Sequence, residues 1–155
     1  MNIHINEPVS IEILRLSENA VLPSKAHGSD AGLDLYADDD FFIKIGETVV
    51  VTTGIALKIP PGYFGKIEDR SGLAMAGLRT GGGVVDSGYN GEVKVVIHNF
   101  NNSDNSNYRG RGYQIKKGQR IAQMVMQVTP TIRLLEVERF PETDRGIKGF
   151  GSSGR

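Results

Sequence analysis

Apolar and polar residues alternate along most of the chain, in short runs that are typical of β-strands. In residues 91–100 (GEVKVVIHNF), for example, Val93, Val95 and Ile97 fall on one face. Turn-forming stretches such as PPG, DSGYNG and NNSDNSN separate the runs. The pattern predicts strands over residues 9–16, 32–37, 41–45, 48–59, 63–69, 91–100, 119–128 and 131–140.

One segment has a different pattern. Residues 71–78 (SGLAMAGL) are rich in alanine and leucine, which favours a short helix. Many short strands with one short helix predict an all-β fold, either a jelly-roll-like sandwich or a barrel. No internal repeat is visible, and 155 residues suit a single domain. We therefore expect one β domain over residues 1–140, followed by a flexible C-terminal arm over residues 141–155.

Some of the predicted strands are apolar on both faces. Val96 interrupts the polar face of residues 91–100, and the runs AQMVMQV and IRLLEV are apolar on both sides in places. An isolated sandwich would show a cleaner alternation, because the outer face of each sheet meets water. A second apolar face is most simply covered by another subunit, so the pattern predicts a homo-oligomer.

Composition and charge narrow the classes of function. The chain has 18 lysines and arginines and 18 aspartates and glutamates, a balance that argues against general binding to nucleic acid or to anionic membranes. It has no cysteine, which excludes disulfides and thiolate metal sites. No apolar run approaches the roughly 18 residues of a membrane span, and the N-terminus lacks the form of a signal peptide. We expect a soluble, cytoplasmic protein.

The common enzyme motifs are absent from the sequence. The three histidines show no metal-ligand spacing, and there is neither a G-x-S-x-G elbow nor a phosphate-binding G-x-x-x-x-G-K-S/T loop. Polar residues instead lie beside glycines or inside apolar strands: Asp34, Arg70, Ser71, Asp86, Tyr89, Gln119, Arg120 and Gln123. Arginines and hydroxyls bind phosphate, backbone N–H groups bind a flat base, and an aspartate can orient a water molecule.

Each of these positions also has a purely structural explanation. Asp34 can cap a turn or pair with a buried arginine. Arg70 and Ser71 can form a surface ion pair and a helix N-cap. Asp86 and Tyr89 can be ordinary turn residues. Together, however, the positions indicate a nucleotide site more strongly than any one of them does alone.

Five stretches of the sequence resemble the five ordered motifs of the trimeric dUTPase family. They are AGLDLYA, RSGLA, GGGVVDSGYNGEV, GQRIAQM and RGIKGFGSSG, and they follow one another from residue 31 to residue 154. Any one of them is weak, but five in this order are specific. The resemblance implies a jelly-roll-like fold, a homotrimer and Mg²⁺-dependent cleavage of dUTP to dUMP and pyrophosphate.

The resemblance also implies a role for each matching residue. Asp86 would position the water that attacks the α-phosphorus, and Tyr89 would support the deoxyribose and exclude a 2′-hydroxyl. The backbone around Gly83 and Val84 would bind the uracil edge. Phosphate contacts would come from Arg70, Ser71, Gly72 and Gln123. Mg²⁺ would be held mainly by the phosphates and water, with Asp34 near its water shell or at a subunit contact.

The C-terminal stretch GFGSSG (149–154) matches the dinucleotide-binding pattern G-x-G-x-x-G letter for letter. That pattern works between a strand and a helix, and only Arg155 follows it here, so a Rossmann site is not expected. A plain Gly/Ser tail is the simplest alternative. The resemblance implies instead a lid that closes over the nucleotide, with Phe150 stacked on the uracil. The lid residues are Arg145, Phe150, Gly151, Ser152 and Ser153.

Three positions differ from the usual pattern of the family. Asp69 stands where a small residue or proline is more common, and its carboxylate could pair with Arg70 and weaken the pull of Arg70 on phosphate. Asn90 replaces a longer polar or basic residue. Ile147 and Lys148 interrupt a stretch of small residues.

Two other functions are compatible with the same fold. A dCTP deaminase would need a carboxylate in the strand after the third motif, near Val96, and VKVVIHN contains none. A non-catalytic nucleotide-binding relative would be expected to lack Asp86, Arg70 or the terminal arm, and all three are present.

Overall fold

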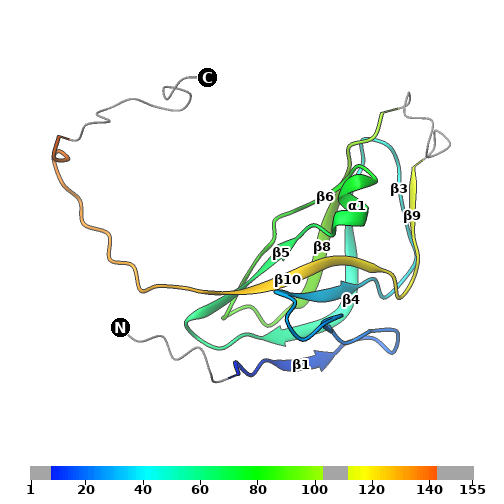
Figure 1. Ribbon diagram of the computed structural model, residues 1–155, viewed down its shortest axis with the longest axis horizontal. Helices are drawn as coiled ribbons and strands as arrows, with labels where there is room; N and C mark the ends of the chain where they lie inside the picture. Colours follow the sequence, from blue (N-terminus) through cyan, green and yellow to red (C-terminus); the bar gives the residue numbers. More distant parts are fainter. Residues whose placement is uncertain (1–7, 103–111, 143–155) are drawn as a thin grey trace.

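The structure is a computed structural model that describes residues 8–102 and 112–142 (Figure 1). The strands of these residues form two four-stranded sheets and one two-stranded sheet, and all of the pairings are antiparallel. The first sheet has the order β1 (Glu12–Arg15), β4 (Thr48–Lys58), β8 (Glu92–Asn99), β6 (Leu78–Gly81). The second has the order β2 (Gly32–Tyr36), β10 (Arg120–Val128), β5 (Tyr63–Glu68), β7 (Val84–Asp86). The third pairs β3 (Phe41–Ile43) with β9 (Tyr113–Ile115).

The hydrophobic core joins all three sheets. The inward side chains of β8, Val93, Val95 and Ile97, are buried as the alternation predicts. They belong to one apolar cluster with Leu35 of β2 and Met124 of β10, which are fully buried. Because separate sheets share this core and do not close on each other, the fold is a sandwich of the jelly-roll kind and not a closed barrel.

Seven of the eight predicted strands are present, each within its predicted range. The prediction of a strand over 131–140 is wrong. These residues form no strand, and they extend away from the sheets after β10 (Figure 1). Their apolar side chains are exposed, for example Leu134 at 91% and Phe140 at 86%. Alternation alone does not make a strand, since the backbone must also pair with a neighbouring edge.

Three strands that the pattern did not predict are β6, β7 and β9. Each has only three or four residues, too few for an alternation to be recognised, and each pairs with one other strand. The predicted helix is confirmed for α1 (Ser71–Met75) but ends before the predicted limit at residue 78. Gly77 adopts a φ of 79°, which ends the helix, and the buried Leu78 begins β6.

Candidate active site

A polar cleft of about 270 Å³ lies where β2, β10 and the start of α1 meet. β10 runs between β2 and β5, so Gln123 lies opposite Asp34 on one side and opposite Glu68 on the other. α1 begins just after β5 and adds the phosphate-binding candidates Arg70 and Ser71. The cleft, called here the phosphate cleft, is lined by Ala26, Asp30, Ala31, Gly32, Asp34, Arg70, Ser71 and Gln123.

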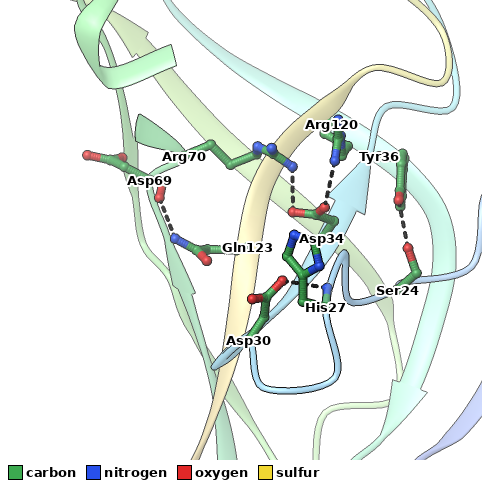
Figure 2. A network of polar contacts seen from close by, with 9 residues as sticks. All are labelled: Ser24, His27, Asp30, Asp34, Tyr36, Asp69, Arg70, Arg120 and Gln123. Carbon is green, nitrogen blue, oxygen red and sulfur yellow. Dashed lines mark hydrogen bonds and ion pairs between the residues drawn. The ribbon is translucent and has the colours of Figure 1, made fainter. Parts of the chain in front are cut away.

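Asp34 is held between two arginines at this cleft (Figure 2). Its Oδ1 accepts a hydrogen bond from Arg70 Nη1 at 2.5 Å, and its Oδ2 accepts one from Arg120 Nη1 at 3.4 Å. Asp34 therefore pairs with arginines, but neither is the buried arginine of the structural alternative, because Arg70 is half-buried and Arg120 is exposed. A guanidinium has five N–H donors, so Arg70 keeps donors for a phosphate while it contacts Asp34. Asp30 also lines the cleft, and the two carboxylates balance the two arginines in charge.

The start of α1 leaves backbone donors open. Arg70 occupies the N-cap position and makes no side-chain cap, so the alternative that Ser71 caps the helix is wrong. Ser71 and Gly72 are both exposed. Among the described residues, no backbone group accepts a hydrogen bond from the N–H of Ser71 or Gly72. Backbone N–H groups that are left free in a turn of this kind can donate hydrogen bonds to phosphate oxygens.

Gln123 connects β10 to the turn that carries Arg70. Its Nε2 donates to the backbone carbonyl of Asp69 at 2.9 Å (Figure 2). Its Oε1 lies over Gly32, where a Cβ would approach it to 2.5 Å. One of its two amide hydrogens is thus used inside the protein, and a phosphate contact through the other stays a prediction.

The expectation that Asp69 could pair with Arg70 is wrong. The Asp69 carboxylate faces β6, where its Oδ2 accepts from Arg79 Nη1 at 2.9 Å. Its Oδ1 accepts from the backbone N–H of Thr80 at 2.7 Å and from Thr80 Oγ1 at 2.8 Å. Partial burial by itself raises the pKa of this carboxyl, but the hydrogen bonds from Arg79 and Thr80 together outweigh it and hold the pKa below 3.8.

A second cleft, of about 170 Å³, lies beside β7 and β8 and is lined by three of the candidate nucleoside residues, Val84, Asp86 and Tyr89, but not by Gly83. Asp86 ends β7 and is exposed, and no group of the described residues donates a hydrogen bond to its carboxylate. An unengaged carboxylate can accept a hydrogen bond from water. This nucleoside cleft is lined by Ile67, Gly82, Val84, Val85, Asp86, Tyr89, Glu92, Val93 and Lys94.

Tyr89 has a fixed orientation at the rim of the nucleoside cleft. Its Oη donates to the backbone carbonyl of Glu92 at 2.8 Å. Its ring covers Gly91, where a Cβ would lie 2.7 Å from the Tyr89 Oη. The side chain is 45% exposed, so one part of it remains open to a ligand.

The glycine-rich hairpin before β7 packs tightly on β5. The backbone N–H of Ile67 donates to the carbonyl of Gly83 at 2.7 Å. A Cβ at Gly83 would lie 2.6 Å from the Ile67 carbonyl oxygen, so only glycine fits there. The exposed Val84 continues the same rim. The predicted uracil contact at Gly83 and Val84 is thus located on a tightly held backbone.

Glu92 is a residue of the nucleoside cleft that sequence reasoning missed. Its Oε1 accepts from the backbone N–H of Gly54 at 3.0 Å, and its Oε2 lies 3.6 Å from Lys94 Nζ. Both oxygens are engaged, so Glu92 does not supply the free carboxylate that a deaminase requires. Glu92 stands inside the GGGVVDSGYNGEV motif, but nothing in the sequence shows that its side chain reaches β4.

The two clefts lie far apart in one chain and share no lining residue. Asp86 lies opposite Phe64 on β5, four residues along that strand from Glu68, which is aligned with Gln123 and Asp34. A rise of ~3.3 Å per residue and a strand spacing of ~4.8 Å separate Asp34 from Asp86 by roughly 20 Å. Asn90 lines neither cleft.

Several predicted residues fall outside the described part of the chain. They are Arg145, Ile147, Lys148, Phe150, Gly151, Ser152 and Ser153. Among the described residues, no group of three or more His, Cys, Asp or Glu side chains could hold a metal ion. In the same residues, no helix is long and apolar enough to cross a membrane.

Comparison with known proteins identifies the family of the chain. A family model described as dUTPase matches residues 18–154. The deoxyuridine 5'-triphosphate nucleotidohydrolase of Clostridium kluyveri is 39% identical over 145 residues, which cover 92% of this chain and 96% of the relative.

Solved structures agree with the sequence comparison. The dUTPase of Staphylococcus bacteriophage 80alpha with dUpNHpp has a TM-score of 0.84 and 33% identity, covering 94% of this chain and 99% of the phage chain. A mutant dUTPase of phage phi11 of S. aureus, described with a structural Mg(II) ion, has a TM-score of 0.76 and 30% identity, covering 86% of this chain and 99% of that one. The resemblance carried by the five motifs is confirmed, and the chain belongs to the dUTPase family.

Proposed function

We propose that this protein hydrolyses dUTP to dUMP and pyrophosphate in the cytoplasm, as a homotrimer that uses Mg²⁺. This reaction would limit uracil incorporation into DNA and supply dUMP for thymidylate synthesis. The observation that carries the proposal is the unengaged Asp86 carboxylate beside the fixed ring of Tyr89 in the nucleoside cleft. Its support is the family membership, together with relatives named for dUTP hydrolysis.

The reaction needs little more than a positioned water and a neutralised phosphate chain. Asp86 orients a water molecule and accepts a proton from it while the water oxygen forms a bond to the α-phosphorus. The bond from the α-phosphorus to the oxygen that bridges it to the β-phosphorus breaks, and pyrophosphate leaves. Arg70, Ser71 and Gly72 hold the departing phosphates through the guanidinium, the hydroxyl and the free backbone N–H groups.

The residues of the phosphate cleft fit a metal that is bound through the nucleotide. Asp30 and Asp34 already balance Arg70 and Arg120 in charge, so the cleft suits a phosphate chain that brings a cation with it. We expect phosphate oxygens and water to hold Mg²⁺, with Asp34 in its outer shell. When bound, Mg²⁺ neutralises charge on the triphosphate.

The separation of the clefts supports an assembly in which chains share sites. Roughly 20 Å between Asp34 and Asp86 is farther than a triphosphate extends, so the two clefts that serve one nucleotide come from different chains. The exposed apolar residues of 131–140, among them Ile132 and Leu135, are available to be covered by a neighbouring subunit in such an assembly.

The C-terminal arm, residues 141–155, is proposed to close over the nucleotide, with Phe150 on the uracil and Arg145, Gly151, Ser152 and Ser153 near the phosphates. Closure would exclude water and strengthen the charges around the triphosphate. Deleting residues 145–155 should lower turnover of dUTP severely and leave the unfolding temperature unchanged. Full turnover by the truncated protein would contradict the lid.

The proposed function is tested by pyrophosphate release from dUTP, dCTP, dTTP and UTP, with and without Mg²⁺. We expect release from dUTP alone, and only with the metal. Absence of release from dUTP overturns the proposal. Ammonia release from dCTP would indicate a deaminase, and binding of dUTP without turnover would indicate a non-catalytic relative.

A further inference from the structure

Asp69 stands at the junction of the two large sheets. It immediately precedes Arg70, Ser71 and Gly72, which are called here the phosphate-binding turn. Its side chain binds Arg79 and Thr80 of β6, which belongs to the first sheet. Its backbone carbonyl accepts from Gln123 of β10, which belongs to the second sheet. One residue therefore ties the turn to both sheets.

Besides Asp69, the turn is held by the ion pair of Arg70 with Asp34 and by the burial of Leu73. α1 has only five residues, and its N-cap residue, Arg70, makes no side-chain cap. The single buried side chain of α1 is Leu73. A helix this short is not stable by itself, so its position depends on contacts at its ends. Asp69 supplies four such contacts, through three hydrogen bonds to its carboxylate and one to its carbonyl.

The arrangement also leaves Arg70 for the phosphate cleft. Because the Asp69 carboxylate is occupied by β6, it does not compete for the neighbouring guanidinium, which reaches Asp34 across the cleft instead. A side chain at residue 69 that lacked acceptors would release the turn from β6 and leave the Thr80 N–H unpaired in a half-buried position.

We propose that Asp69 is a positioning residue for the phosphate-binding turn: by tying the turn to β6 and β10, it sets the geometry with which Arg70 and Ser71 meet the triphosphate. This inference rests on the proposed function for the identity of the ligand. Asp69 touches neither substrate nor water in the reaction, and it acts only through the residues that follow it.

The test compares four variants that remove different parts of the junction. Asp69→Ala removes all three acceptor contacts of the carboxylate. Asp69→Asn keeps an oxygen for both Thr80 bonds and loses only the ion pair with Arg79. Arg79→Met removes that ion pair from the other side, and Thr80→Val removes one hydroxyl bond.

The matched control is Asp40→Asn. The Asp40 carboxylate also accepts from a backbone N–H, that of Lys117 at 2.8 Å, and from a cation, Lys116 Nζ at 3.1 Å. It lies between β2 and β3 and lines neither cleft. Loss of such a contact away from the turn should leave the kinetics of dUTP hydrolysis unchanged.

We expect Asp69→Ala to raise the KM for dUTP on the order of tenfold, with a smaller change in kcat, because misplaced donors weaken phosphate binding. Affinity for inorganic triphosphate, measured by calorimetry, should fall by a similar factor. Asp69→Asn should recover most of the loss, and the two β6 variants should fall between Asp69→Ala and wild type. Unfolding curves check that each variant is folded.

Folded Asp69→Ala with wild-type KM and wild-type affinity for inorganic triphosphate overturns the inference. If Asp69→Ala does not fold, Arg79→Met and Thr80→Val provide the test. An unchanged KM for dUTP in both of these variants overturns the inference. If the wild-type protein does not hydrolyse dUTP but the variants still lose affinity for inorganic triphosphate, the proposed function fails and the role of Asp69 stands.

Discussion

At the scale of single residues, the two clefts differ in how their charges are used. In the phosphate cleft Asp34 is engaged by Arg70 and Arg120. In the nucleoside cleft Asp86 has no donor among the described residues, while its neighbours Tyr89 and Glu92 are fixed by hydrogen bonds. A free carboxylate among fixed groups is suited to orient a water molecule, and this contrast distinguishes Asp86 from the other acidic side chains of the clefts.

Replacing the Asp86 carboxylate tests this role directly. Asp86→Asn should slow turnover of dUTP by on the order of 10²- to 10⁴-fold, the usual contribution of a positioned base. Binding of dUpNHpp should change little, because other residues are proposed to hold the phosphates and the base. Steady-state kinetics and calorimetry measure the two effects, and near-normal turnover would refute the assignment.

Tyr89 should decide the choice of sugar. Tyr89→Ala should narrow the difference in kcat/KM between dUTP and UTP, because the ring that is proposed to contact the sugar is gone. Tyr89→Phe is the matched control, since it keeps the ring and loses only the bond to the Glu92 carbonyl. The ratio of kcat/KM for the two nucleotides is the readout, and an unchanged ratio in Tyr89→Ala would assign the discrimination to another residue.

At the scale of elements, alternation predicted strands that bury one face over several residues, such as β8 and β10. It missed β6 and β7, which have three or four residues and are positioned by pairing with the edge of a neighbouring strand. The same dependence on an edge explains why 131–140 is not a strand. The motifs indicated Asp86 and Arg70. They did not indicate the contacts of Asp69 with Thr80 and of Glu92 with Gly54, because each of these contacts joins separate segments of the chain and leaves no local sequence pattern.

The junction between α1 and β6 should make stability depend on acidity. The folded pKa of Asp69 lies below its ordinary value of 3.8, so the stabilisation is present above that value and is lost as pH falls through the folded pKa. The free energy of unfolding of wild type should therefore exceed that of Asp69→Asn at pH 7, and the difference should shrink toward pH 3. Urea unfolding at both pH values measures it, and a difference that grows on acidification would contradict the prediction.

At the scale of the whole molecule, the roughly 20 Å between Asp34 and Asp86 along the second sheet is the feature that bears most on function. Asp86 lies on β7, an edge strand of that sheet, and Asp34 lies on β2 at the opposite edge. The candidate residues for one nucleotide thus lie at the two edges of one chain, and in the proposed assembly a complete site would combine clefts from two chains.

Mixed assemblies provide the test of this division. Asp86→Asn damages only the nucleoside cleft, and Arg70→Met damages only the phosphate cleft. Unfolding the two inactive variants together and refolding them should restore part of the activity, because some sites then combine two intact clefts. Each variant refolded alone is the control, and no recovery in mixed assemblies that mass spectrometry has verified would argue for sites built within one chain.

In the proposed assembly, the division of the site between the edges of the second sheet would also make catalysis subject to mass action. A chain released from such an assembly would carry two half-sites and no complete one, so the specific activity should fall on dilution below the dissociation constant of the assembly. Substitutions at the interface between subunits would then lower the rate of hydrolysis as directly as substitutions in the clefts. The dUTP-hydrolysing activity in a cell would then rise more than proportionally with the amount of this protein.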